Sequence, residues 1–183
     1  MKTNLTSQDL ELHRHHYTSN LPAVYCGTYA KYNSGDLSGM WLDLCSFETY
    51  EEFIEFCTQL HADEHDPELM FQDFENFPST WYCESCMSEE IFEKILQFAD
   101  LDQDERNAFC EFIDMRGESA TIEDFEEANC GKWDSEEEFA ENLMRECYNI
   151  PQELENYIDF KKFADELFMF DYEMCGDYVL RKY

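Results

Sequence analysis

The stretch AVYCGTYAKYNSGDLSGMWLDL, residues 23–44, decides the fold class. Its first ten residues, 23–32, alternate in side-chain character with the period of two that is typical of a β-strand. The segment NSGDLSG follows and contains Gly35 and Gly39, and its residue types are typical of a turn. GMWLDL then resumes a strand pattern, so the sequence predicts an antiparallel hairpin over residues 23–44.

A helix and a further strand are expected to complete a small α+β unit. Thr49 is placed to cap a helix over residues 50–61, and ELMFQDFENFP reads as a third strand that ends at Pro78. The apolar side chains of this helix repeat on one face and are expected to point inward: Tyr50, Phe53, Ile54, Cys57 and Leu60.

The segment ADLDQDERNAFCEF, residues 99–112, has the acidic spacing of a calcium loop but favours a helix. The sixth loop position needs a glycine for its sharp turn, and here it is Glu105. Asp102 can instead cap a helix that has Asp104 and Glu105 in its first turn. One apolar stripe supports this helix: Ala108, Phe109, Phe112 and Ile113.

Several more helices are expected on the same grounds. Ser88 caps residues 89–99, Thr121 begins TIEDFEEANC, which Gly131 closes, and Ser135 caps residues 136–147. PQELENYI and DFKKFADELF are also helical, and CGDYVLRKY ends the chain as a strand. The inward face of the 136–147 helix is Phe139, Ala140, Leu143, Met144 and Cys147.

The predicted architecture is α+β, with three small domains in a row. The domains are an antiparallel sheet with a helix at 22–80, a helical middle at 81–120 and an α+β domain at 121–183. Residues 1–21 are polar and are expected to form a flexible leader.

The composition describes a folded protein with a strongly negative surface. The 183 residues include 43 acidic and 12 basic side chains, giving a formal net charge of −31. Such charge argues for disorder when apolar residues are scarce, but 44% of the residues are hydrophobic and 16% aromatic. Phosphate repulsion makes nucleic acid an improbable partner and a basic protein surface the expected one.

The chain shows no membrane, export or enzyme signature. It has no apolar run near the ~18 residues of a membrane span and no apolar region typical of a secretion signal. Its nine cysteines lack the rhythm of a disulfide scaffold, which favours a reducing cytoplasm. P-loop, GxGxxG, GxSxG and HExxH motifs are missing, so no catalytic residue and no cofactor are predicted.

No metal site is predicted either. Cys83 and Cys86 form a lone CxxC, without the further ligands that a structural zinc site needs, and are expected to be ordinary loop thiols. His61 and His65 flank the acidic loop HADEH and are expected to be surface histidines. The leader histidines are likewise not assigned to a metal.

The charge itself suggests a function. Duplex DNA carries one charge per ~1.7 Å of axis, so 31 charges at that density would cover about 53 Å, or about 15 base pairs. A two-fold dimer would cover about 30 base pairs by the same arithmetic. An elongated protein could therefore imitate the line charge of DNA and occupy a DNA-binding groove as a decoy.

From residue 22 onward the chain resembles the ArdA antirestriction family. The resemblance is carried by PAVYCGTYAKYNSGDLSGMWLDL at 22–44, HDPELMFQDFENFP at 65–78, CGKWDSEEEFAENL at 130–143, IDFKKFADELF at 158–168 and DYVLRKY at 177–183. It implies a curved, elongated homodimer of three small domains that imitates bent B-form DNA. It also implies a partner, the DNA-binding channel of Type I restriction–modification enzymes, and a dimer contact in the C-terminal domain.

Thirteen carboxylates are expected to stand in for DNA phosphates. Five lie on a matching family motif: Asp134, Glu136, Glu137, Glu138 and Glu141. Eight are chosen from charge and expected exposure alone: Glu51, Glu52, Glu89, Glu90, Glu123, Asp124, Glu126 and Glu127.

Two other functions stay open at this level. A general acidic chaperone for basic proteins would need the same negative surface but no particular shape. A divalent-metal protein would use residues 99–112 or the HADEH loop.

Overall fold

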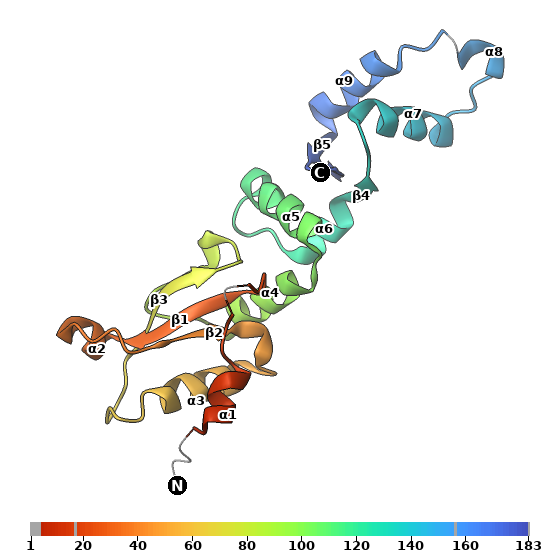
Figure 1. Ribbon diagram of the computed structural model, residues 1–183. Helices are drawn as coiled ribbons and strands as arrows, with labels where there is room; N and C mark the ends of the chain where they lie inside the picture. Colours follow the sequence, from red (N-terminus) through yellow and green to blue (C-terminus); the bar gives the residue numbers. More distant parts are fainter. Residues whose placement is uncertain (1–4, 17, 156, 183) are drawn as a thin grey trace. The chain divides into compact units, whose positions relative to one another are not determined.

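The computed structural model describes residues 5–16, 18–155 and 157–182 (Figure 1). The chain divides into two compact units, residues 1–100 and 101–183. Each unit combines helices with a three-stranded antiparallel sheet, which confirms the α+β class. The boundary between the units falls inside the predicted middle domain, residues 81–120, and the division into three domains stays a prediction.

The helices and strands of the first unit are α1 (Ser7–Leu12), β1 (Ala23–Thr28), α2 (Tyr29–Ser34), β2 (Met40–Asp43), η1 (Leu44–Ser46), α3 (Tyr50–Leu60), β3 (Leu69–Glu75), η2 (Ser79–Trp81) and α4 (Glu89–Asp100). Those of the second unit are α5 (Gln103–Arg116), α6 (Ile122–Ala128), β4 (Asn129–Lys132), α7 (Glu136–Cys147), α8 (Gln152–Glu155), α9 (Phe160–Phe170), β5 (Tyr172–Cys175) and β6 (Tyr178–Arg181).

The first sheet has the order β2-β1-β3 and contains the predicted antiparallel pair. The strand predicted over residues 23–32 is too long, because β1 stops at Thr28. Thr28 Oγ1 accepts a hydrogen bond from the backbone N–H of Lys31 (3.2 Å) and so caps the short helix α2. Gly35 ends α2 in the left-handed conformation, with φ of 79°.

Stacked aromatic rings form the core of the first unit. Phe53 of α3 stacks on Phe71 of β3 and on Phe92 of α4, with ring centroids 5.7 and 5.5 Å apart. Thr49 caps α3 as predicted, and Phe53 and Cys57 are buried. Phe56 is buried as well, although the predicted inward face omitted it.

The leader is not loose over its described part. α1 begins with a capping box, and the chain after it runs beside β2. The backbone N–H of His15 donates to Trp41 O, and that of Asp43 donates to His13 O, both at 3.0 Å. Both histidines are buried, with His13 stacked on Phe47 at 4.1 Å. The prediction of a flexible leader missed these contacts because the polar composition of residues 1–21 does not reveal pairing with a distant strand.

The second sheet, β4-β6-β5, lies between two pairs of helices (Figure 1). Val179 of β6 packs with Phe139 of α7 and Phe168 of α9 in one apolar cluster. The neighbouring Tyr178 meets Phe125 of α6, with ring centroids 6.4 Å apart. Successive residues of a strand point to opposite faces, so β6 joins both helix pairs to one sheet.

Helix α5 confirms the helix that the sequence predicts after Asp102. Asp102 Oδ1 accepts from the N–H of Glu105, and Glu105 Oε2 accepts from the N–H of Asp102, both at 2.9 Å. This is a capping box, and the predicted apolar stripe is buried.

Two expectations for the second unit are corrected and one is extended. The helix predicted to reach Gly131 ends at Ala128, because residues 129–132 pair with β6 as strand β4. Cys147 was expected to face inward but is exposed on the last turn of α7. The predicted C-terminal strand is confirmed as β6, and it forms a hairpin with β5, a strand that was not predicted.

Replacement of Phe139 tests the core of the second unit. Phe139 is 5% exposed and contacts the rings of Trp133, Phe168 and Tyr172. Phe139→Ala should lower the free energy of unfolding by about 3–5 kcal/mol in urea titrations, because it leaves a cavity. The matched control is Phe170→Ala, since Phe170 is 60% exposed and its removal should change stability by well under 1 kcal/mol. Equal losses for both variants would contradict this assignment of the core.

Docking of the leader should depend on pH through His13. Burial lowers the pKa of His13 from its usual value, against the opposing carboxylates of Glu52, Asp9 and Asp43. The unfolded chain therefore takes up the proton more readily than the folded one. The stability contributed by neutral His13 is complete above about pH 6.5 and is lost as the pH falls through the lower folded-state pKa.

The measurement is the free energy of unfolding of wild type and His13→Phe between pH 7.5 and 5, since phenylalanine keeps a ring on Phe47 but cannot be protonated. Both proteins share the other titrating groups, so the stability of the wild type relative to the variant should decline on acidification. Parallel curves would mean that protonation of His13 has no part in docking.

Candidate protein-interaction surface

Helix α7 carries the carboxylates that match the family motif. Ser135 Oγ accepts from the N–H of Glu138 (3.1 Å) and fixes the start of the helix. Asp134 and Glu136–Glu138 are exposed, whereas Phe139 and Ala140 are buried. The helix thus separates charge from core, and its dipole favours acids in the first turn.

Two of these carboxylates also have local partners. Glu138 Oε2 accepts from the backbone N–H of Asp134 (3.1 Å). Glu141 is less exposed than expected, because its side chain forms an ion pair with Arg145 Nη2 at 2.6 Å. Of the five motif acids, Glu141 is therefore the least suited to meet an external cation.

Helix α6 repeats the arrangement of α7. Ile122, Phe125 and Ala128 are buried, and the four acids predicted on this helix are exposed. Asp124 is tied to the helix start, because its Oδ2 accepts from the backbone N–H and the hydroxyl of Thr121 at 2.9 and 2.7 Å. The remaining predicted acids of α6 are Glu123, Glu126 and Glu127.

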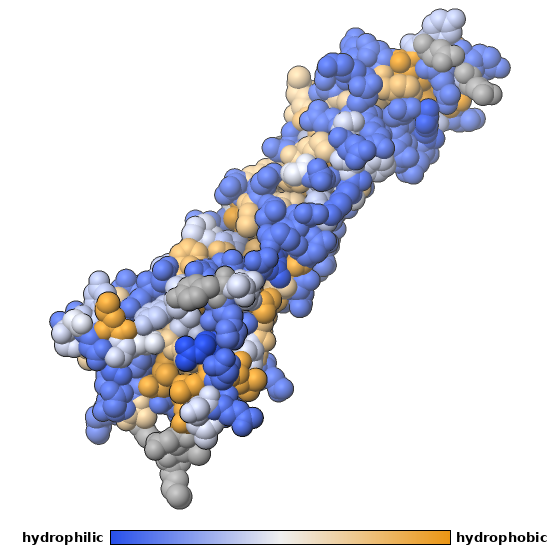
Figure 2. Space-filling model, in the orientation of Figure 1, coloured by the Kyte–Doolittle hydropathy of each residue, from blue (hydrophilic) through white to orange (hydrophobic). Residues whose placement is uncertain are grey.

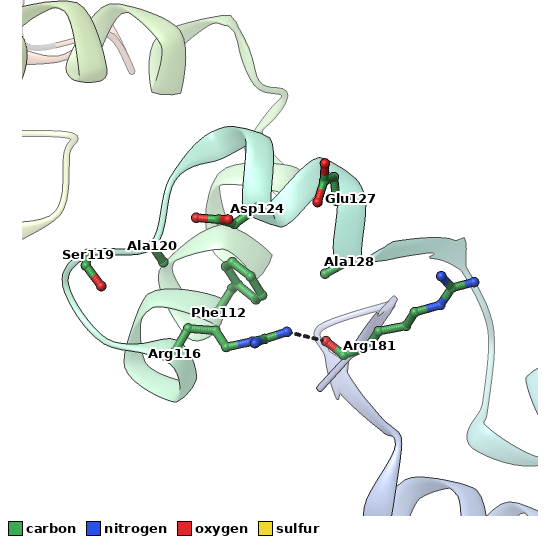
Figure 3. Close-up of a pocket in the computed structure, with 8 residues that line it drawn as sticks. All are labelled: Phe112, Arg116, Ser119, Ala120, Asp124, Glu127, Ala128 and Arg181. Atoms are coloured by element: carbon green, nitrogen blue, oxygen red, sulfur yellow. Dashed lines mark hydrogen bonds between the residues drawn. The ribbon is translucent and has the colours of Figure 1, made fainter. Parts of the chain in front are cut away.

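A pocket of about 470 Å³ adjoins α6 and mixes both signs of charge (Figure 3). Asp124 and Glu127 line it from α6, and Arg116 and Arg181 line it from α5 and β6. Arg116 Nη2 donates to the backbone oxygen of Arg181 at 3.0 Å, which ties α5 to β6. The two arginines thus partly compensate the negative potential of α6 at this pocket.

In the first unit the predicted acids lie in the first turns of two helices, α3 and α4. Glu51 and Glu52 are exposed on the first turn of α3, and Glu52 Oε2 accepts from the N–H of Glu48 (2.9 Å). Glu89 and Glu90 are exposed on the first turn of α4, after Ser88, whose hydroxyl accepts from the N–H of Ile91. All thirteen predicted carboxylates are therefore at the surface, twelve of them exposed and Glu141 half-buried.

The structure also exposes acids that the prediction left out. Glu111 and Asp114 are exposed on α5, and Asp165 and Glu166 are exposed on α9. The predicted set favoured the first turns of helices. The spacing of these acids relative to the apolar stripe of each helix would have identified them.

Basic side chains mostly serve internal contacts. Lys182 Nζ donates to Phe168 O (2.7 Å) near the end of α9, and Arg106 Nε donates to Leu101 O (3.0 Å). Lys132 Nζ binds Asp104 (2.7 Å), and Lys31 Nζ binds Asp63 (2.9 Å). These contacts use cations to stabilise the fold, and most of the carboxylates remain uncompensated at the surface.

The excess of acid is shared between the units. Residues 1–100 carry 19 acidic and 4 basic side chains, and residues 101–183 carry 24 and 8. Hydrophilic side chains cover most of the face shown in Figure 2. Each unit therefore presents a negative surface of its own.

The described parts of the chain contain neither a group of metal ligands nor a membrane-spanning helix. No group of three or more His, Cys, Asp or Glu among these residues could hold a metal ion. His65 is exposed as expected, but His61 is buried, and its Nδ1 lies 3.0 Å from Lys31 Nζ. The described helices are all too short or too polar to cross a membrane.

Fold and surface define a class of protein, the small acidic α+β proteins that present carboxylates on the outer faces of their helices. The sequence model of the antirestriction protein family ArdA matches residues 24–179. The chain thus belongs to the ArdA family of antirestriction proteins. The comparison with curated proteins gave no match.

Proposed function

We propose that this protein imitates DNA and occupies the DNA-binding channel of Type I restriction–modification enzymes. It would thereby protect incoming mobile DNA in the cytoplasm of a bacterial host. One observation carries the proposal: the surplus acids of an antirestriction-family chain lie on helix faces directed to solvent. The protein acts by binding alone, with no catalytic step.

The carboxylates take the place of phosphates. A DNA-binding channel presents lysines and arginines to a row of negative charges, and its affinity for DNA depends strongly on that electrostatic contribution. In this protein the acids are held on helices whose opposite faces are buried, so little additional order is needed on binding. Complementary charge also steers the encounter and raises the association rate.

The proposal requires a particular distribution of charge. A row of carboxylates matches a duplex only if the protein is long and thin, as the line-charge arithmetic and the family resemblance imply. We therefore propose an elongated homodimer, with the dimer contact in the C-terminal domain. Small-angle X-ray scattering on the purified protein reports length and mass together, and a compact monomer would contradict this form of the mimic.

Competition with DNA is the direct test. The protein should displace a labelled duplex from the core methyltransferase of a Type I enzyme near stoichiometric concentration at low salt. Displacement should weaken steeply as salt rises, because screening shortens the range of charge interactions. Failure to displace DNA at low salt with stoichiometric protein would refute the proposal.

A general acidic chaperone is the competing function, and the same assay can distinguish it. A chaperone would bind histones, lysozyme and other basic proteins about as well as the restriction enzyme. A DNA mimic should prefer the enzyme channel at matched ionic strength, because only the channel is shaped for a duplex.

Binding should be distributed over many acids. Five glutamates have no capping or Arg145 contact among the described interactions, so neutralising them removes none of these contacts: Glu123, Glu126, Glu127, Glu136 and Glu137. Each single change to glutamine should weaken inhibition by about 0–1 kcal/mol, the range for an exposed ion pair. The quintuple variant should lose the sum of these contributions, with unfolding in urea as the control for stability. Loss of inhibition from one glutamine alone would show a localised site instead.

A further inference from the structure

The CxxC segment places two thiols side by side at the surface. The Sγ atoms of Cys83 and Cys86 lie 3.1 Å apart, and both residues are exposed. Ser85 Oγ lies 3.4 Å from Cys83 Sγ. The sequence predicted ordinary loop thiols, but this separation is close enough for the two sulfurs to react with each other.

Hydrogen bonds hold the loop on both sides of the thiols. Tyr82 Oη donates to Phe71 O (2.6 Å), and the N–H of Phe71 donates to Glu84 O (2.8 Å), so the start of the loop is tied to β3. At its end Met87 is buried, and its carbonyl accepts from Tyr50 Oη (2.6 Å). The two sulfurs are thus presented by a fixed backbone.

The two thiols differ in acidity. Hydrogen bonds from Ser85 and Cys86 lower the pKa of Cys83 to about 7, whereas the neighbouring Cys83 raises the pKa of Cys86. At neutral pH a large share of Cys83 is therefore the nucleophilic thiolate. Cys86 remains a protonated thiol at this stage.

We propose that Cys83 and Cys86 form a reversible thiol–disulfide site that exchanges with small disulfides of the glutathione class. The Cys83 thiolate attacks one sulfur of the small disulfide, forms a mixed disulfide and releases one small thiolate. Cys86 then loses its proton and attacks Cys83 Sγ, which closes the Cys83–Cys86 bond and releases the second thiolate. The protein gives up two electrons and two protons, and the small disulfide becomes two thiols.

The other cysteines provide an internal comparison. Cys26, Cys57 and Cys175 are buried and shielded from a solvent-borne disulfide. Cys110 is exposed on α5, but burial of its sulfur and the nearby Asp114 raise its pKa, which lowers its thiolate fraction. Cys83 should therefore be attacked before Cys110 and before the three buried cysteines.

Peptide mapping can read the bond directly. The reduced full-length protein is incubated with oxidised glutathione without oxygen, alkylated, and cleaved after glutamate. Cleavage after Glu84 separates Cys83 from Cys86, so their peptides stay together only when the disulfide joins them. We expect the linked pair to form in most molecules and to separate again after treatment with dithiothreitol.

Two serine variants distinguish the roles. Cys86→Ser should retain glutathione on Cys83, because the second attack is lost, and Cys83→Ser should give neither the linked pair nor rapid labelling. Cys110→Ser is the matched control and should form the linked pair at the wild-type rate. Absence of the linked pair in excess oxidised glutathione, or a bond that joins two chains instead, would overturn the proposal. So would labelling of Cys110 as fast as that of Cys83.

Discussion

The structure depends on packing aromatic rings tightly enough to hold together a chain with a net charge of −31. Repulsion among like charges favours expansion, and the opposing force is the burial of apolar surface. A buried phenylalanine contributes about 1.5–3 kcal/mol relative to an exposed one, and ring contacts in suitable orientations add to this. Each unit has such contacts: Phe53 lies between Phe71 and Phe92 in the first, and Phe109, Phe112 and Phe125 contact one another in the second.

The helices that bury these rings also carry acids in their first turns, where a negative charge destabilises the fold least. A carboxylate in the first turn of a helix interacts favourably with the helix dipole, by about 0.3–1 kcal/mol at an exposed site. α3, α4, α6 and α7 all have acidic residues in the first turn. Some of these acids, such as Asp124, also satisfy backbone N–H groups. The negative surface that the proposed function needs is thus partly stabilised by the fold that carries it.

The sequence predicted helices well because their signals are local. Thr49, Asp102, Thr121 and Ser135 each stand directly before a helix and accept a hydrogen bond from its first turn. The boundaries that failed depend on distant partners. β4 forms because β6 is beside it, and the leader docks because β2 offers a free edge. Strand pairing over such separations leaves little trace in the local pattern.

The site shows the same division between local and distant information. Charge and expected exposure alone selected Glu123, Glu126 and Glu127, and all three are exposed. These criteria could not predict that Glu141 is paired with Arg145, or that the thiols of Cys83 and Cys86 lie in contact. The Glu141–Arg145 ion pair depends on the conformations of two side chains. The contact between Cys83 and Cys86 depends on hydrogen bonds between their loop and β3.

A binding surface made of many similar charges tolerates single substitutions better than the core does. If affinity comes from a summed field, each exposed acid contributes little and its loss is tolerated. The aromatic core has no such redundancy, because a ring such as Phe139 contacts several others and its removal leaves a cavity. Residues such as Phe139 and Phe168 hold α7 and α9 to the sheet and so keep their acids in place. The positions that matter most for inhibition should therefore include buried ones that never meet the enzyme.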